Sequence, residues 1–176
     1  MTGAITLERR QVTEVRVAGR RLEGHAAVFG VEARIADFTE VIAPGAFAAS
    51  LGRGQDILAL ADHDPARLLA RTKSGTLNLR EDAKGLAFSL DVPDTQAGRD
   101  VLALAERGDL GGMSFGFTVP KGGERWQGRR RELRQVDLKE VSVVSAWPAY
   151  AETTVAARSR VPPRLALARL YMETVR

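Results

Sequence analysis

Two short segments of the sequence carry side chains that could act together as a nucleophile and a base. Ser114 lies in the glycine-lined stretch 108–117, Gly-Asp-Leu-Gly-Gly-Met-Ser-Phe-Gly-Phe, and His63, one of only two histidines, lies in Leu-Ala-Asp-His-Asp-Pro at 60–65. A serine hydroxyl becomes a useful nucleophile only when a base within hydrogen-bonding reach removes its proton. The pair indicates acyl-transfer chemistry, although glycine-rich stretches of this kind also form structural turns that lead into strands.

The residues around Ser114 alternate as in a β-strand, so the pattern predicts which way the hydroxyl points. One face would hold the large apolar side chains of Met113, Phe115, Phe117 and Val119, and the other would hold Ser114, Gly116 and Thr118. Successive side chains of a strand point to opposite faces, and the apolar face packs on the core. We therefore expect Ser114 to point outward, with glycines that allow a substrate or another backbone to approach closely.

Either histidine could be the base. His25 occupies a strand position next to Gly24, where packing or edge exposure explains it. His63 ends an apolar run and precedes Asp64-Pro65, which predicts a position where a strand passes into a turn and a side chain can face a cleft. The residues alone leave both histidines open.

A catalytic imidazole also needs a carboxylate that fixes its tautomer. Asp62 and Asp64 flank His63, but neighbours on an extended strand point to opposite faces, unless the turn at Pro65 brings Asp64 round. Glu140 lies in a predicted strand at 137–144 and would share a face with Leu138 and Ser142, which holds it against the body of the protein. The alternative for Glu140 is an ordinary surface charge at a strand edge.

Other chemistries find less support. The chain has no cysteine, which excludes a thiol nucleophile and cysteine-ligated zinc. Asp62, His63 and Asp64 are chemically suitable metal ligands, but three consecutive strand residues cannot converge on one ion. The glycines at 108–114 follow a predicted helix instead of opening one, and the lysine of a phosphate-binding loop is missing. We expect neither a metal nor a cofactor.

The charge distribution bears on possible partners. The net charge is +4, but segments 121–134 and 157–176 each contribute +4, which leaves the remainder at −4. Two basic segments keep nucleic-acid binding open as an alternative function, although no zinc finger, helix-turn-helix or ribonucleoprotein motif supports it. No stretch approaches the roughly 20 apolar residues of a membrane span, so we expect no membrane association.

The elements that must position these residues read as strands, a helix, and strands again. Strands are expected at 5–17, 21–29, 55–61, 76–80, 85–92, 113–119, 131–136 and 137–144, and a basic hairpin around 121–123 and 127–128. A short helix is expected at 44–51, and a longer helix at 95–107 that Gly108 ends. This order predicts an α+β fold with a largely antiparallel, barrel-like β core and flanking helices. We expect one domain at 1–157, and a linker and helical tail at 158–176.

Five short blocks, in this order, resemble the prohead (capsid maturation) serine proteases of tailed bacteriophages. Besides the serine and histidine segments they are Gly-His-Ala-Ala-Val-Phe-Gly at 24–30, Glu-Val-Ile-Ala-Pro-Gly-Ala-Phe at 40–47, and Leu-Lys-Glu-Val-Ser-Val-Val at 138–144 followed by Pro148-Ala149. The resemblance covers roughly residues 20–155. It implies a fold related to herpesvirus assemblin.

The resemblance also implies an activity and a site. The family's Leu-x-x-His motif falls on His63, its Gly-x-Ser-[Phe/Ile]-Gly-Phe motif on Ser114, and its Glu-Val-Ser block places the third catalytic member at Glu140. The implied enzyme is an endopeptidase that removes scaffolding segments from the major capsid protein, and trims itself, inside the assembling procapsid in the host cytoplasm. Self-association is also implied. A non-catalytic scaffold or assembly protein is the alternative, and Gly111, Gly112 and 129–131 are candidates for stabilising the oxyanion.

Overall fold

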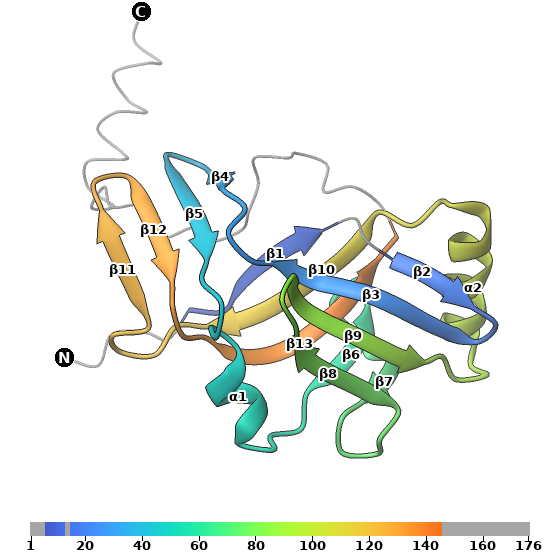
Figure 1. The fold of residues 1–176 in the computed structure, drawn as a ribbon. Helices are drawn as coiled ribbons and strands as arrows, with labels where there is room; N and C mark the ends of the chain where they lie inside the picture. The colour runs from blue at the N-terminus through green and yellow to red at the C-terminus, as the bar shows by residue number, and fades with distance from the viewer. Residues whose placement is uncertain (1–5, 13–14, 146–176) are drawn as a thin grey trace, which may run out of the picture.

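Three β-sheets and two short helices make up the described part of the chain, residues 6–12 and 15–145 of the computed structural model (Figure 1). The first sheet contains the candidate site. Its five strands lie in the order β1 (Glu8–Val12), β10 (Gly112–Thr118), β13 (Asp137–Val144), β6 (Leu58–Ala61) and β7 (Asp64–Arg71). The pairing is antiparallel except between β13 and β6, which are parallel.

The second sheet is antiparallel and packs against the first. It consists, in spatial order, of β2 (Val15–Ala18), β3 (Arg21–Val28), β9 (Gly85–Asp91) and β8 (Leu77–Glu81). Strand β3 lies against both β1 and β10, so the two sheets enclose the core between them (Figure 1).

The third sheet extends from one end of the molecule, at the left of Figure 1. Its order is β11 (Glu124–Gln127), β12 (Arg130–Leu133), β5 (Phe38–Ile42) and β4 (Ala33–Ile35), with β12 and β5 parallel. It joins a hairpin from late in the chain to a hairpin from early in the chain.

The longer helix forms where the sequence supplies a cap at each end, whereas the shorter one has no side-chain cap. In α2 (Gln96–Arg107), the Thr95 side chain accepts a hydrogen bond from the Gly98 amide, and Gly108 ends the helix with a left-handed φ of 76°. Helix α2 packs beside β2 and β7 at the opposite end of the molecule from the third sheet (Figure 1). Helix α1 (Ala48–Gly52) is a single short turn beside β13 and β8.

A row of aromatic rings crosses the core. Phe115 lies 5.5 Å from Phe47 and 5.2 Å from Phe117 between ring centroids, and all three are fully buried. Two of these rings belong to β10. The apolar face of the strand that carries Ser114 is therefore fixed by tight packing.

The expected barrel is wrong for the described residues, because their three sheets stay open, each with two edge strands. Both expected helices are present, with α1 shorter than predicted. The expected strands are present except the single strand at 5–17, which is two strands, β1 and β2, in different sheets. Three strands were not predicted: β4, β5 and β7, the last of which begins with Asp-Pro and carries two arginines. The predicted linker and tail at 158–176 lie outside the described residues.

Candidate active site

Ser114 occupies the middle of β10, which lies between β1 and β13 in the first sheet. It pairs with Gln11 on β1 and with Ser142 on β13. As the alternation predicts, Met113, Phe115 and Phe117 enter the core and Ser114 lies on the other face. That face is not open to solvent, however: Ser114 is only 3% exposed, because neighbouring side chains of the sheet crowd it.

His63 belongs to a two-residue turn that joins β6 to β7. Ala61 pairs with Asp64 across the turn, and the two residues between them have positive φ, 53° for Asp62 and 61° for His63. Both angles fit a type I′ hairpin, and Asp and His tolerate this backbone region better than most residues. The predicted turn at Pro65 is wrong, since Pro65 lies within β7, an edge strand where its missing N–H is tolerated.

The turn is tied to the end of β13. The Asp62 amide donates a 2.9 Å hydrogen bond to the Val143 carbonyl. The Asp62 carboxylate accepts hydrogen bonds from the Ser145 amide at 2.7 Å, the Ser145 hydroxyl at 3.0 Å and Arg67 at 2.6 Å. Asp62 therefore holds the position of the histidine turn, and its carboxylate has its own partners.

A β-bulge brings Glu140 to the same face as Ser114. In the register of β10 and β13, Glu140 pairs with Gly116 but Leu138 pairs with Phe117, which leaves Lys139 as an extra residue. The bulge resets the alternation, so Leu138 enters the core while Glu140 and Ser142 lie opposite Gly116 and Ser114. The prediction that Glu140 and Leu138 share a face is therefore wrong, whereas Glu140 and Ser142 do share one.

The carboxylate of Glu140 binds the imidazole of His63. The distance from His63 Nδ1 to Glu140 Oε1 is 2.7 Å, and the Ser142 hydroxyl donates to Glu140 Oε2. Burial disfavours the charged carboxylate, but the hydrogen bonds from His63 and Ser142, with the positive charge of Arg9, outweigh it and lower the pKa of Glu140. An ionised Glu140 accepts a hydrogen bond from the Nδ1–H group of His63, and in this tautomer the lone pair of the neutral imidazole is on Nε2.

The structure thus brings His63 and Glu140 into direct contact. Ser114 lies on the strand adjacent to Glu140, two residues before Gly116, the cross-strand partner of Glu140. Among the described residues, no hydrogen bond joins the Ser114 hydroxyl to His63. His25, the other candidate base, pairs with Asp82 through Nε2 at 2.9 Å in the second sheet.

The Caudovirus prohead serine protease family model matches residues 6–163. The chain belongs to this family. Among solved structures, the bacteriophage T4 capsid assembly protease, gp21, is similar over 82% of this chain and 98% of its own, with a TM-score of 0.52 and 12% identity. At that identity the likeness establishes a shared fold. No curated protein matches the sequence significantly.

Within this prohead protease, two residues without a predicted role shape the site. A Cβ atom at Gly116 would lie 2.6 Å from Glu140 Oε1, so the glycine leaves the space that the carboxylate fills. Arg9 of β1 approaches the same oxygen, with its Nε at 3.4 Å. The glycine could have been singled out because it lies on the serine face of β10, two residues after Ser114. Nothing in the sequence connects Arg9 to the site.

One of the candidates for stabilising the oxyanion, Gly111, already uses its backbone amide elsewhere. The Gly111 amide donates to the Val144 carbonyl at 2.8 Å, so it is not free to bind an oxyanion. In segment 129–131, the Arg131 guanidinium is fully buried among carboxylates.

Within the described residues, no group of three or more acidic or histidine side chains is arranged to hold a metal ion, and no helix is long and apolar enough to cross a membrane.

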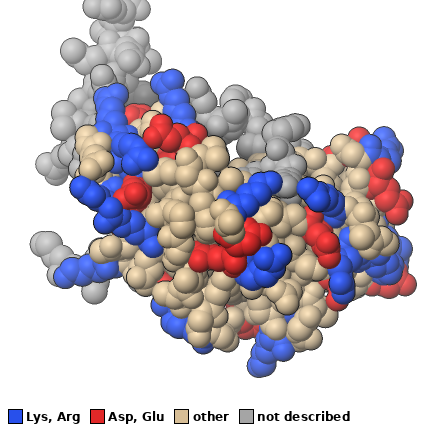
Figure 2. All heavy atoms as spheres, in the orientation of Figure 1, with Lys and Arg blue, Asp and Glu red and all other residues tan. Residues whose placement is uncertain are grey.

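The basic hairpin at 121–134 is partly neutralised. Three of its six basic residues form ion pairs: Arg130 with Glu32, Arg134 with Glu132, and Arg131 with buried glutamates. Figure 2 shows positive and negative groups interspersed over this face, without one continuous basic surface. For the segment 121–134, the basic charge that kept nucleic-acid binding open is therefore weaker in three dimensions than in the sequence, while the segment 157–176 lies outside the described residues.

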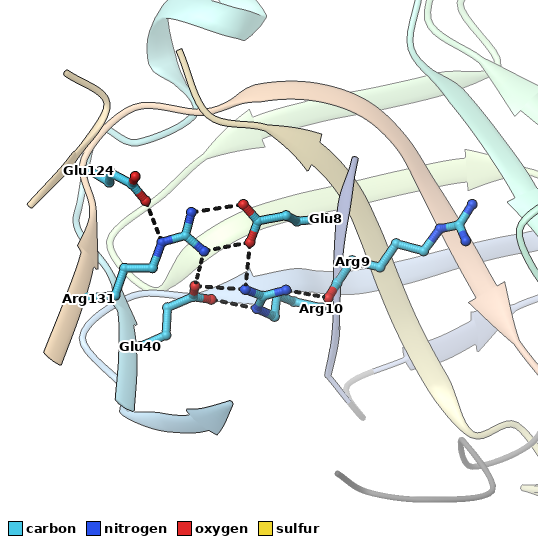
Figure 3. A network of polar contacts seen from close by, with 6 residues as sticks. All are labelled: Glu8, Arg9, Arg10, Glu40, Glu124 and Arg131. Carbon is cyan, nitrogen blue, oxygen red and sulfur yellow. Dashed lines mark hydrogen bonds and ion pairs between the residues drawn. The ribbon is translucent and has the colours of Figure 1, made fainter. Parts of the chain in front are cut away.

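A buried ion cluster anchors β1, the strand that carries Arg9 (Figure 3). Glu8 and Arg10, whose side chains lie on the face of β1 opposite Arg9, pair with Arg131 of β12 and Glu40 of β5. Arg10 contacts Glu40 at 2.5 Å and 2.7 Å in a bidentate pair. The cluster joins β1 of the first sheet to β5 and β12 of the third.

Proposed function

We propose that this chain is a serine endopeptidase that removes scaffolding segments from the major capsid protein, and trims itself, inside the assembling procapsid in the host cytoplasm. Ser114 is the nucleophile, His63 the base and Glu140 the group that orients the base. The observation that carries the proposal is the 2.7 Å hydrogen bond from His63 Nδ1 to a buried carboxylate on the strand next to Ser114. Family membership supports the prohead as the place of action.

The geometry supports acyl transfer. With its Nδ1 proton bound by Glu140, His63 accepts the Ser114 hydroxyl proton at Nε2 as the serine oxygen attacks a peptide carbonyl. The imidazolium then returns the proton to the departing amine, which leaves an acyl-enzyme, and a water molecule activated by the same base releases the second product. Glu140 stays ionised throughout and stabilises the imidazolium.

Substitution of the nucleophile tests the proposal. Ser114→Ala, expressed with the capsid precursor, should leave the precursor uncleaved while proheads still assemble, as followed by gel electrophoresis and electron microscopy. Ser89→Ala is the control, because Ser89 lies in β9 of the second sheet. Normal cleavage by the Ser114 variant would refute the proposal and favour a non-catalytic scaffold. We also propose, from the family resemblance, that the fold is related to that of herpesvirus assemblin and that the chain associates with copies of itself.

A further inference from the structure

The two oxygens of the Glu140 carboxylate have different partners. Oε1 receives the hydrogen bond from His63 and faces Arg9, whereas Oε2 receives the hydrogen bond from the Ser142 hydroxyl. Ser142 is fully buried, at 0% exposure. No catalytic role for this second serine follows from the motifs described above.

Ser142 lies where it can control the carboxylate. It follows Glu140 by two residues on β13, on the same face, and it is the direct cross-strand partner of Ser114. The terminal torsion of a glutamate side chain is broad, so one hydrogen bond to an imidazole does not fix the plane of the carboxylate. A second hydrogen bond, from the hydroxyl of the fully buried Ser142, fixes that plane.

We propose that Ser142 is a positioning residue: by binding Oε2 of Glu140 it directs Oε1 to His63 and keeps the carboxylate ionised. This inference rests on the proposed function for its catalytic consequence. A hydrogen bond to the charged form of an acid stabilises that form, so the contact acts on the charge of Glu140 as well as on its orientation.

Another buried serine, Ser50, serves as a comparison, because its hydroxyl binds a backbone group and not a carboxylate. Ser50 of α1 is also fully buried, but its hydroxyl accepts a 2.9 Å hydrogen bond from the backbone amide of Leu138. Ser50 therefore satisfies the backbone of the same strand, β13, without contacting the carboxylate. The two serines form a matched pair for experiment.

The test compares Ser142→Ala, Ser142→Thr and Ser142→Val with Ser50→Ala in the full chain. Threonine and valine have the same shape, but only threonine keeps the hydroxyl. The pKa of Glu140 is measured by carbon-13 NMR of the labelled carboxyl group, and kcat and KM are measured with purified capsid precursor. We expect the alanine and valine variants to raise the pKa of Glu140 and to lower kcat by about 10- to 100-fold with KM unchanged.

Threonine should restore both quantities, and Ser50→Ala should change neither. A folded Ser142→Ala or Ser142→Val protein with the original Glu140 pKa and kcat would overturn the inference, as would equal effects of threonine and valine. Loss of all cleavage with an unchanged Glu140 pKa would instead identify Ser142 as the nucleophile. If Ser114→Ala leaves cleavage intact, the proposed function fails, while the titration still decides whether Ser142 controls Glu140.

Discussion

At the scale of single residues, the site depends on a side chain that is absent. Gly116 lies opposite Glu140 in the register of β10 and β13, and the carboxylate occupies the space where a Cβ atom would be. The backbone of Gly116 needs no special φ. The glycine is therefore required for the room it leaves to Glu140, and a substitution there acts directly on the carboxylate that binds His63.

We predict that Gly116→Ala folds but moves the Glu140 carboxylate away from His63. A methyl group 2.6 Å from Oε1 displaces the flexible end of the side chain more easily than the paired strands. Cleavage of capsid precursor should fall by about 10- to 100-fold, the effect of losing one charge-assisted hydrogen bond.

Gly52→Ala is the control for the Gly116 variant, since a Cβ atom at Gly52 meets no atom within 4 Å. It should cleave at the original rate. Equal cleavage rates for the two alanine variants would contradict the role assigned to Gly116.

At the scale of elements, the hairpin turn between β6 and β7 determines the position of His63, the proposed base. Two non-glycine residues with positive φ cost of the order of 1–3 kcal/mol each, so the turn needs contacts that hold it. Asp62 supplies them through Ser145 and Arg67. Burial opposes its ionisation, but the hydrogen bonds from Ser145 and Arg67 prevail and lower the pKa of Asp62.

We predict that Asp62→Ala loosens this turn and lowers cleavage, whereas Asp62→Asn largely preserves both. Asparagine tolerates a positive φ and keeps an oxygen acceptor for Ser145. Hydrogen exchange at the residue 62 amide, which donates to the Val143 carbonyl, reports the loosening independently of activity. Protection that is as strong in the alanine variant as in the original chain would argue against this anchor.

At the scale of the whole molecule, the buried ion cluster joins strands that are far apart in the sequence. Arg131 has no exposed surface and binds Glu8, Glu40 and Glu124. Burial opposes ionisation of Glu8, yet its hydrogen bond with Arg131 and the charges of Arg131 and Arg10 lower its pKa. The cluster thus stabilises the assembled sheets and keeps β1, with Arg9, beside the site.

We predict that Arg131→Met destabilises the protein by about 3–5 kcal/mol, because it leaves buried glutamates without their cation. Arg130→Met, one residue earlier, breaks only the exposed pair with Glu32 and should cost less than about 1 kcal/mol. Urea denaturation of the two variants measures the difference. Similar losses for both would mean that burial of the cluster contributes little.

The same cluster predicts acid sensitivity. Glu8 has a lowered pKa in the folded state, so its contribution to stability is complete above the ordinary value of 4.5 and is lost as the pH falls through the lowered value. Glu140 contributes in the same direction. The free energy of unfolding of the original chain should therefore fall with pH below about 4.5. The Glu8 share of this dependence should be smaller in the Arg131→Met variant, in which Arg10 alone still pairs with Glu8.

Local patterns in the sequence were enough to predict several helices and strands of this prohead protease and to select its candidate residues. Alternation around Ser114 predicted its strand and its separation from the aromatic core, and caps at Thr95 and Gly108 predicted α2. These features depend on neighbours within a few residues, which a sequence displays directly. The motifs selected His63 and Glu140 because their residue types and order resemble the family.

Only the tertiary structure decided how these residues meet. The bulge at Lys139, which separates Glu140 from Leu138, exists only in the register of β13 against β10. The burial of Ser114, the space at Gly116 and the approach of Arg9 depend on strands as far apart in the sequence as β1 and β13. The open sheets likewise follow from pairings such as β12 with β5, which depend on long-range complementarity and leave no periodic trace in either segment.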